Sequence, residues 1–258
     1  MLVLFCLRLA CGLLGSLLFL GSLAVNPRFY RTQFLVALGL GAAAAVFLRE
    51  TAGILVWLAL ILAMVGTLLG SLVWSLEGAP GGQVLVWLTT LAFLGTLAAS
   101  SFQPFVDTRT GPQKETVCEA WQLADDLTSA ALLGTATTAM LMGHFYLIAP
   151  SMSLAPLLRL LSLLFAAICL RLASAAVGLG FWTMRHSLGN LEDVTVFWLP
   201  LRWGLGLVAP LVLGWMAREA ARIRSTQSAT GILYVVVIFG FLGELTSMLL
   251  YRHTGYPL

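Results

Sequence analysis

Four ionisable side chains stand out inside long apolar stretches of this sequence: His144, Arg171, Arg202 and Glu244. A charged side chain in the middle of a bilayer is costly, so such residues face the interior of a helix bundle and find partners there. An arginine beside a glutamate can form a buried ion pair, or it can bind an anionic head group or a carbonyl-bearing ligand. A buried glutamate or histidine can also carry protons. These four residues are therefore the first candidates for chemistry.

The composition explains why so few polar residues stand out. Of 258 residues, 60% are hydrophobic and 10% are charged, and the mean hydropathy is +0.96. Soluble domains carry about 25% charged residues, so the chain is expected to be a polytopic membrane protein. A net charge of +3, from 14 basic and 11 acidic residues, argues against a nucleic-acid partner.

Motifs for catalysis or metal binding are missing from the sequence. The four cysteines form no CxxC pair and no cluster with histidine, so neither a metal site nor a disulfide framework is predicted. No nucleotide-binding loop and no hydrolase signature is present. We therefore assign no catalytic residue, and any chemistry must use the isolated polar groups or partner subunits.

Eight apolar stretches approach the roughly 20 residues that a helix needs to cross a membrane. The polar segments between them include a short break at 26–33 and a long loop at about 101–126. Within that loop, Glu115–Ala124 has the spacing of a surface helix, and Asp125 or Asp126 is a plausible N-cap for the next span. No stretch could form a soluble domain, so residues 1–258 are predicted to form one all-α transmembrane helical bundle. The expected spans are Met1–Val25, Phe34–Leu48, Ala52–Leu76, Val84–Ser100, Leu127–Ile148, Leu157–Trp182, Thr195–Ala217 and Thr230–Tyr251.

Arg202 and Glu244 are predicted to lie at the same depth. Each is about seven residues from the same membrane surface, on consecutive antiparallel spans, which places both roughly 10 Å below that surface. Arg171 is predicted to lie a few ångströms deeper. Two interpretations stay open: an ion pair that fixes helix packing, or a site for an anionic or carbonyl-bearing ligand.

His144 and Tyr146 lie near the opposite end of the fifth span and form a second candidate point. A histidine there could ligate haem, bind a quinone carbonyl, shuttle a proton or only pack. Bis-histidine haem would need His186 or His253, and the topology places both about 20 Å or more away. Bis-histidine haem is therefore disfavoured, haem held by one histidine and another ligand stays open, and quinone is the cofactor that we consider.

The orientation of the chain in the membrane is predicted from the number of lysine and arginine residues in the loops on each side. The loops after odd-numbered spans carry six of these residues and the opposite surface carries five. The arginine cluster at 218–224, close to a helix end, favours a cytoplasmic position for the loops after odd-numbered spans, whose six basic residues we call the first group. Both termini and the 101–126 loop are then outside, in a plasma membrane of the bacterial inner-membrane type. The first group is Arg28, Arg31, Arg159, Arg218, Arg222 and Arg224.

The C-terminal segment from Gly243-Glu244-Leu245 through Leu249-Leu250-Tyr251 to Gly255-Tyr256-Pro257-Leu258 resembles the last helices of NrfD and DmsC-type membrane anchors. It covers 16 of the 258 residues. Proteins of those families have about eight spans, lack a cofactor of their own and exchange quinol with an attached iron–sulfur subunit. The resemblance implies that Glu244 is a quinone-site acid, and it is extended to no other residue.

Three functional hypotheses follow. The first is an integral subunit of a respiratory or photosynthetic-type electron-transfer complex, either structural or contributing to a quinone site, with partner redox subunits in the membrane. The second is a small-solute or ion transporter, which predicts related halves and broken helices, although no four-plus-four repeat is evident in the sequence. The third is a membrane scaffold or assembly protein whose polar groups only fix packing.

Overall fold

A computed structural model describes residues 1–21, 25–48, 52–76, 81–101, 119–148, 152–185 and 193–256. All regular structure within these ranges is helical. The helices are α1 (Leu2–Leu17), α2 (Pro27–Phe47), α3 (Ile54–Val73), α4 (Gly82–Ser101), α5 (Glu119–Ile148), α6 (Ala155–Arg185), α7 (Asp193–Trp203), the π-helical turn η2 (Gly204–Val208), α8 (Ala209–Arg222) and α9 (Thr226–Thr254).

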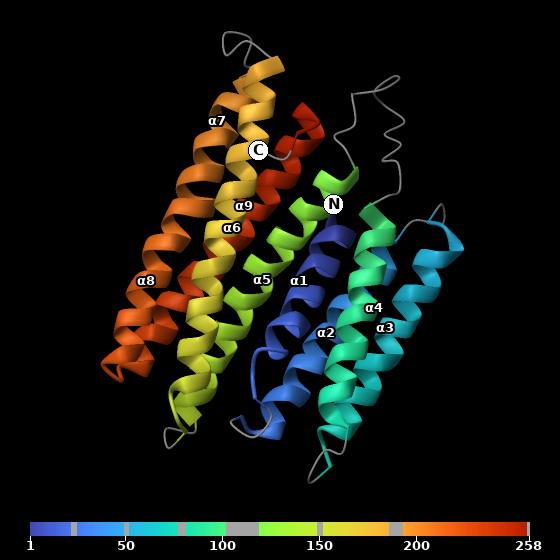
Figure 1. Cartoon of the computed structure of the whole chain (residues 1–258), viewed down its shortest axis with the longest axis vertical. Coiled ribbons are helices and arrows are strands. Elements are labelled where there is room, and N and C mark those ends of the chain that lie inside the picture. Colours follow the sequence, from blue (N-terminus) through green and yellow to red (C-terminus); the bar gives the residue numbers. More distant parts are fainter. Residues whose placement is uncertain are drawn as a thin grey trace.

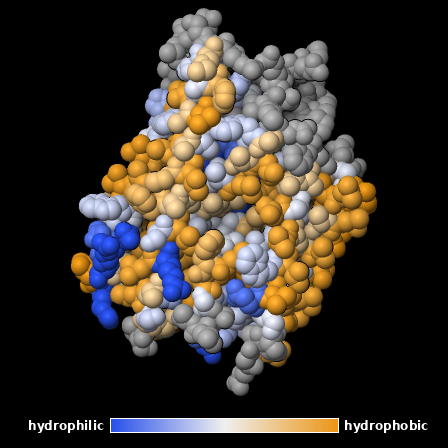
Figure 2. All heavy atoms as spheres, viewed as in Figure 1, coloured by the Kyte–Doolittle hydropathy of each residue, from blue (hydrophilic) through white to orange (hydrophobic). Residues whose placement is uncertain are grey.

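Seven helical segments are long and apolar enough to cross a membrane, with α7, η2 and α8 forming a single one, and α1 is a shorter apolar helix. Figure 2 shows apolar side chains over the flanks of the bundle. Leucines on α3 such as Leu55 and Leu62 are more than half exposed, which suits a surface in contact with lipid rather than water. The predicted all-α polytopic bundle is confirmed, and the chain is an integral membrane protein.

The first two helices have different bounds from those predicted. α1 ends at Leu17 rather than Val25, and α2 begins at Pro27 rather than Phe34. The reason is local: the Asn26 side chain accepts a 2.9 Å hydrogen bond from the Arg28 backbone N–H, and Pro27 occupies the first helical turn. Asparagine as N-cap followed by proline is a helix start, so the polar segment that we interpreted as a break begins a helix.

The predicted capping role of Asp125 or Asp126 is wrong. α5 begins at Glu119, so both aspartates lie inside the helix, almost two turns from its start. Residues 119–124 of the expected surface helix are continuous with α5, and residues 102–118 lie outside the described part of the chain. The consequence is large, because two carboxylates expected at the membrane surface are instead within the bundle.

The eight helical segments form two four-helix halves with the same order of contacts (Figure 1). In the first half α1 packs against α2 and α4, while α3 packs against α2 and α4. In the second half α5 packs against α6 and α9, while α8 packs against α6 and α9. α1 and α5, the first helices of each half, make the most extensive contact between any two helices. The structure therefore contains a four-plus-four organisation that the sequence did not reveal.

Two glycines allow α1 and α5 to touch. A Cβ atom added to Gly12 would overlap the backbone of Ala130, and one added to Gly134 would overlap the backbone of Gly12. Small residues at such a crossing let helix backbones approach closely in a membrane. The two halves are therefore joined by direct backbone contact.

Candidate functional site

Glu244 of α9 is the centre of a buried ion network. Arg171 of α6 binds it in a bidentate fashion, with 2.9 Å from Nε to Oε1 and 2.9 Å from Nη2 to Oε2. Arg202 of α7 places Nη1 3.1 Å from Oε1 of the same carboxylate. All three side chains are fully buried. The predicted pairing of Arg202 with Glu244, with Arg171 beside them, is therefore present.

Three further charged residues, which we did not include, complete the network. Arg8 of α1 donates from Nε to Asp126 Oδ1 at 2.7 Å and lies 3.7 Å from Glu244 Oε2 through Nη1. Asp125 forms ion pairs with Arg8 at 3.4 Å and with Arg171. Three guanidinium groups thus face three carboxylates, which gives the cluster a formal charge of zero. Mutual neutralisation of this kind is what makes charges tolerable in a membrane interior.

The sequence contained a signal for this larger network. Arg8 is the only charged residue in the first apolar stretch, and it lies close to the start of its helix, as Asp125 and Asp126 lie close to the start of α5. The first and fifth spans begin at the same surface of the bundle, so these residues share a depth. We missed the match because the aspartates were interpreted as a helix cap.

Hydroxyl groups fill the remaining hydrogen-bond positions of the carboxylates. Ser129 donates to Glu244 Oε2 at 2.6 Å and accepts from Arg8 Nη1 at 3.2 Å. Ser101, the last residue of α4, donates to Asp126. Ser247, one turn after Glu244 on α9, accepts from Arg171 Nη2 at 3.3 Å. Hydrogen bonds to both partners lower the cost of burying an ion pair.

Arg202 is the exception in this otherwise satisfied cluster. None of its three guanidinium nitrogens makes a hydrogen bond of acceptable geometry to a described residue, although Nη1 remains in ion-pair contact with Glu244. The indole N–H of the adjacent Trp203 is also buried without a partner among the described residues. Buried donors are nearly always paired in native proteins, so donors left open at one place call for a specific explanation.

The backbone around Arg202 is built to accommodate its side chain. The π-helical turn η2 begins two residues later, between Pro200 and Pro210. Gly206 of this turn crosses Gly243 of α9, and a Cβ atom added at either glycine would come within 3.3 Å of Arg202 Nη1. π-helical turns occur frequently at functional sites. The distortion and the glycine pair together leave room for the guanidinium beside Glu244.

Aromatic side chains lie on the side of Arg202 that faces the nearer end of the bundle. Trp182 of α6, Leu250 of α9 and Tyr256 form a small buried cluster, against which Trp198 and Leu199 of α7 pack. Trp198 and Leu199 lie one turn before Arg202, so they occupy the same face of α7. On α6 and α9 the cluster lies beyond Arg171 and Glu244, towards the ends of these two helices.

His144 and Tyr146 do not join the network. His144 lies about 27 Å from Asp126 along the axis of α5, and its side chain is exposed. The expectation that it faces the interior is wrong, because α5 buries the face that carries Ala139, Met142 and Tyr146. The Tyr146 hydroxyl donates to the Ser153 carbonyl and so ties the end of α5 to the start of α6. His186 and the side chain of His253 lie outside the described residues.

Within the described residues, no group of three or more histidine, cysteine, aspartate or glutamate side chains is placed to hold a metal ion. Comparison of the chain with family models, with curated proteins and with solved structures found no match. A function must therefore be argued from the site itself.

Proposed function

We propose that the protein is an integral subunit of an electron-transfer complex in a plasma membrane, and that its buried ion network contributes to a quinone site. In this proposal Arg202 donates hydrogen bonds to a quinone carbonyl. Reduction of the quinone to quinol takes two electrons from an attached redox subunit and two protons. The network supplies hydrogen-bonding and carboxylate groups, and the partner subunit supplies the electrons.

One observation carries this proposal: Arg202 is fully buried, and while Nη1 contacts Glu244, its Nε and Nη2 donors have no acceptor among the described residues. Arg8 and Arg171 are instead held by several acceptors each. A carbonyl oxygen is a suitable acceptor in a site that excludes water, because a hydrogen bond from a charged donor is stronger there than in water. The aromatic cluster that contains Trp182 and Trp198 would contact the quinone ring.

The site's depth fits a membrane-soluble ligand. Arg8 and Asp125 lie about 9 Å from the start of their helices at 1.5 Å per residue. A quinone head group in a bilayer can reach such a depth with its isoprenoid tail still in lipid. The proposed orientation places this end, with both termini, outside, because the arginine cluster 218–224 lies at the other end.

Binding of a short-chain ubiquinone to the purified protein tests the proposal. Quenching of tryptophan fluorescence would be followed in lipid nanodiscs for the natural protein, for Arg202→Gln and for Arg222→Gln. Arg222 is an exposed arginine paired with Glu219 at the far end, so its substitution is a matched control. We expect Kd to rise about tenfold or more in Arg202→Gln only, since hydrogen bonds to charged groups contribute about 1.5–3 kcal/mol.

Equal affinities in all three proteins would overturn the proposal. If Arg202→Gln does not assemble, Arg202→Lys keeps the charge but loses the planar fork of donors, and it is expected to weaken binding similarly. Mass spectrometry of the protein extracted in mild detergent tests the partner separately. Iron–sulfur, haem or other electron-transfer subunits at fixed stoichiometry support the complex, and a chain that is extracted alone contradicts it.

The two four-helix halves favour transport of a small solute as a second candidate. Many transporters consist of two related halves, with a binding site beside a broken helix. The matching contact order of the halves and the π-helical turn beside Arg202 fit that description. Uptake into proteoliposomes that Arg171→Ala abolishes would support transport. A protein that neither transports nor binds quinone would be a scaffold, whose balanced charges serve packing.

A further inference from the structure

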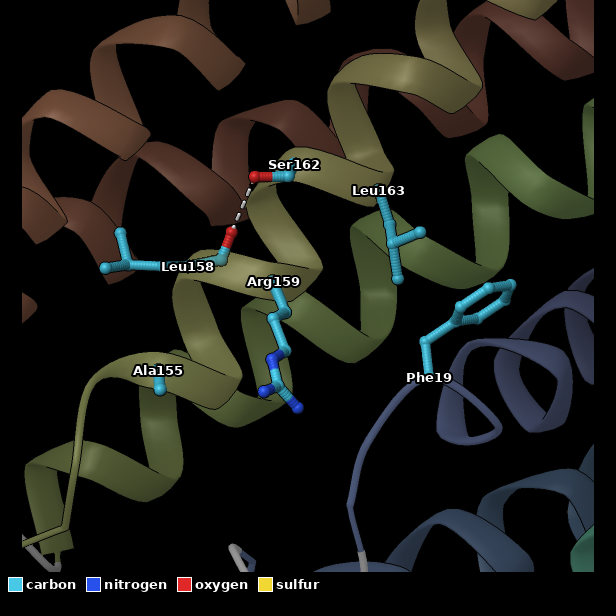
Figure 3. A pocket seen from close by; sticks show the side chains of 6 residues that line it. All are labelled: Phe19, Ala155, Leu158, Arg159, Ser162 and Leu163. Carbon is cyan, nitrogen blue, oxygen red and sulfur yellow. Dashed lines mark hydrogen bonds between the residues drawn. The ribbon is translucent and has the colours of Figure 1, made fainter.

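A groove opens on the membrane-exposed surface at the end of the bundle opposite the ion network (Figure 3). It lies between Phe19, just beyond the end of α1, and the first turns of α6, and its volume is about 570 Å³. The Leu163 side chain extends from α6 towards Phe19 (Figure 3). The residues that line it are Phe19, Ala155, Leu158, Arg159, Ser162 and Leu163.

The groove lies beside the end of α1, which is a short helix. Its 16 residues extend about 24 Å, less than the roughly 30 Å of a bilayer's hydrocarbon core. α6 has 31 residues and continues beyond the end of α1. Phe19 is the one described residue outside α6 that lines the groove.

One charged group lies in this otherwise mainly apolar groove. Arg159 is exposed, and no described residue forms a hydrogen bond or an ion pair with it. The only other polar side chain in the lining, Ser162, donates its hydroxyl hydrogen to the Leu158 carbonyl at 3.0 Å. The guanidinium of Arg159 is thus the group available to a ligand's head group, while the remaining lining suits hydrocarbon.

We propose that this groove binds one molecule of an anionic phospholipid. The phosphate of the head group pairs with Arg159, and an acyl chain lies between Phe19 and Leu163. Basic pockets between transmembrane helices are where anionic head groups bind, and a zwitterionic lipid offers the arginine a phosphate that its own ammonium group already neutralises. The site is separate from the ion network, so the proposal stands or falls independently of the quinone site.

Quantification of lipid retained by the purified protein tests the proposal. The natural protein, Arg159→Gln and the control Arg222→Gln would be exchanged from detergent into equimolar phosphatidylglycerol and phosphatidylcholine. After delipidation, native mass spectrometry then counts bound lipid. We expect one retained phosphatidylglycerol on the natural protein and on Arg222→Gln, and about fivefold less on Arg159→Gln.

A second variant examines the hydrocarbon part of the site. Ala155→Trp places a large side chain in the groove lining without removing the charge, and we expect it to lower phosphatidylglycerol retention as well. Retention of both lipids to the same extent by the natural protein would overturn the proposal. Retention unchanged by Arg159→Gln would do so too, as would displacement of the bound lipid by millimolar inorganic phosphate, which would indicate a site for free anions.

Discussion

The two four-helix halves share one order of helix contacts but have different interiors. In the described part of α1–α4, Arg8 is the one buried charged side chain, and it points to the other half. The rest of the described interior there is uncharged and partly aromatic: Tyr30 stacks on Trp74 with ring centroids 4.1 Å apart, and Phe34 and Phe93 are fully buried. The described residues of the second half include five buried charged ones, namely Asp125, Asp126, Arg171, Arg202 and Glu244.

The difference shows that this helix arrangement does not require buried ions. The first half packs in the same contact order with aromatic rings and small residues, so this contact order does not by itself explain the ions of the second half, and they can serve another purpose. Replacing buried ion pairs with apolar groups is often neutral or stabilising, which means that they are weak evidence for a role in stability alone. A ligand that needs donors and carboxylates in lipid is one such purpose, and our proposal assigns it to Arg202 and Glu244.

Glu244→Ala is expected to destabilise the protein most, because it removes the carboxylate that Arg171 and Arg202 share. Breaking a buried pair by deleting one partner costs about 3–5 kcal/mol, since a buried charge is left uncompensated. The variant should lose assembled protein, measured as the monodisperse fraction on size exclusion and as the midpoint of thermal unfolding in detergent.

A double variant separates charge balance from the loss of a side chain. Glu244→Leu combined with Arg202→Leu leaves Arg8 and Arg171 opposite Asp125 and Asp126, so the cluster stays neutral. We expect it to unfold at a higher temperature than Glu244→Ala. If the double variant is the less stable of the two, the network acts through contacts other than charge.

Gly12→Ala is expected to cause the next largest loss of stability, because it pushes the two four-helix halves apart. Its Cβ atom would overlap the Ala130 backbone, which cannot give way as a flexible side chain can. Overpacking of this kind costs about 1–3 kcal/mol. Gly15→Ala is the control on the same helix, because its nearest neighbour is a Thr90 methyl at 3.8 Å. Equal unfolding midpoints for the two variants would show that the crossing is not a tight contact in the membrane.

The fold was largely predictable because membrane length imposes it. Stretches such as Ala52–Leu76 are apolar throughout, and α3 lies within that range. The predicted bounds were wrong where a helix extends into a polar segment, as in α2, which begins at Pro27, and in α5, which begins at Glu119. The reason is that hydropathy indicates which residues lie in the bilayer and not how far the helix continues. The small residues at 134–139 are typical of a close helix–helix contact, but the two-half arrangement depends on which helix faces touch, and the sequence alone does not show that Gly134 meets Gly12.

Part of the site was predictable for the same reason. Equal depth on antiparallel neighbours predicted that Arg202 and Glu244 meet, and they do. Depth alone could not place Arg8, because its contact with Asp126 depends on α1 lying against α5 across 118 residues of sequence. Depth also could not show that His144 faces outward, which depends on the rotation of α5. The roles proposed for these residues stay predictions until binding is measured.

Gln33→Leu is expected to change the stability least, and to raise it rather than lower it. Gln33 lies on α2 in the first half, it is fully buried, and neither atom of its amide has a partner among the described residues. A buried polar group without a hydrogen bond is destabilising by about 1–3 kcal/mol, so leucine should raise the unfolding midpoint slightly or leave it unchanged. Thr138→Val is the matched control, because the Thr138 hydroxyl accepts a 2.7 Å hydrogen bond from Ser16 and its loss should lower the midpoint. A marked loss of stability in Gln33→Leu would mean that the amide binds a polar ligand or water, and that the first half also has a buried polar site.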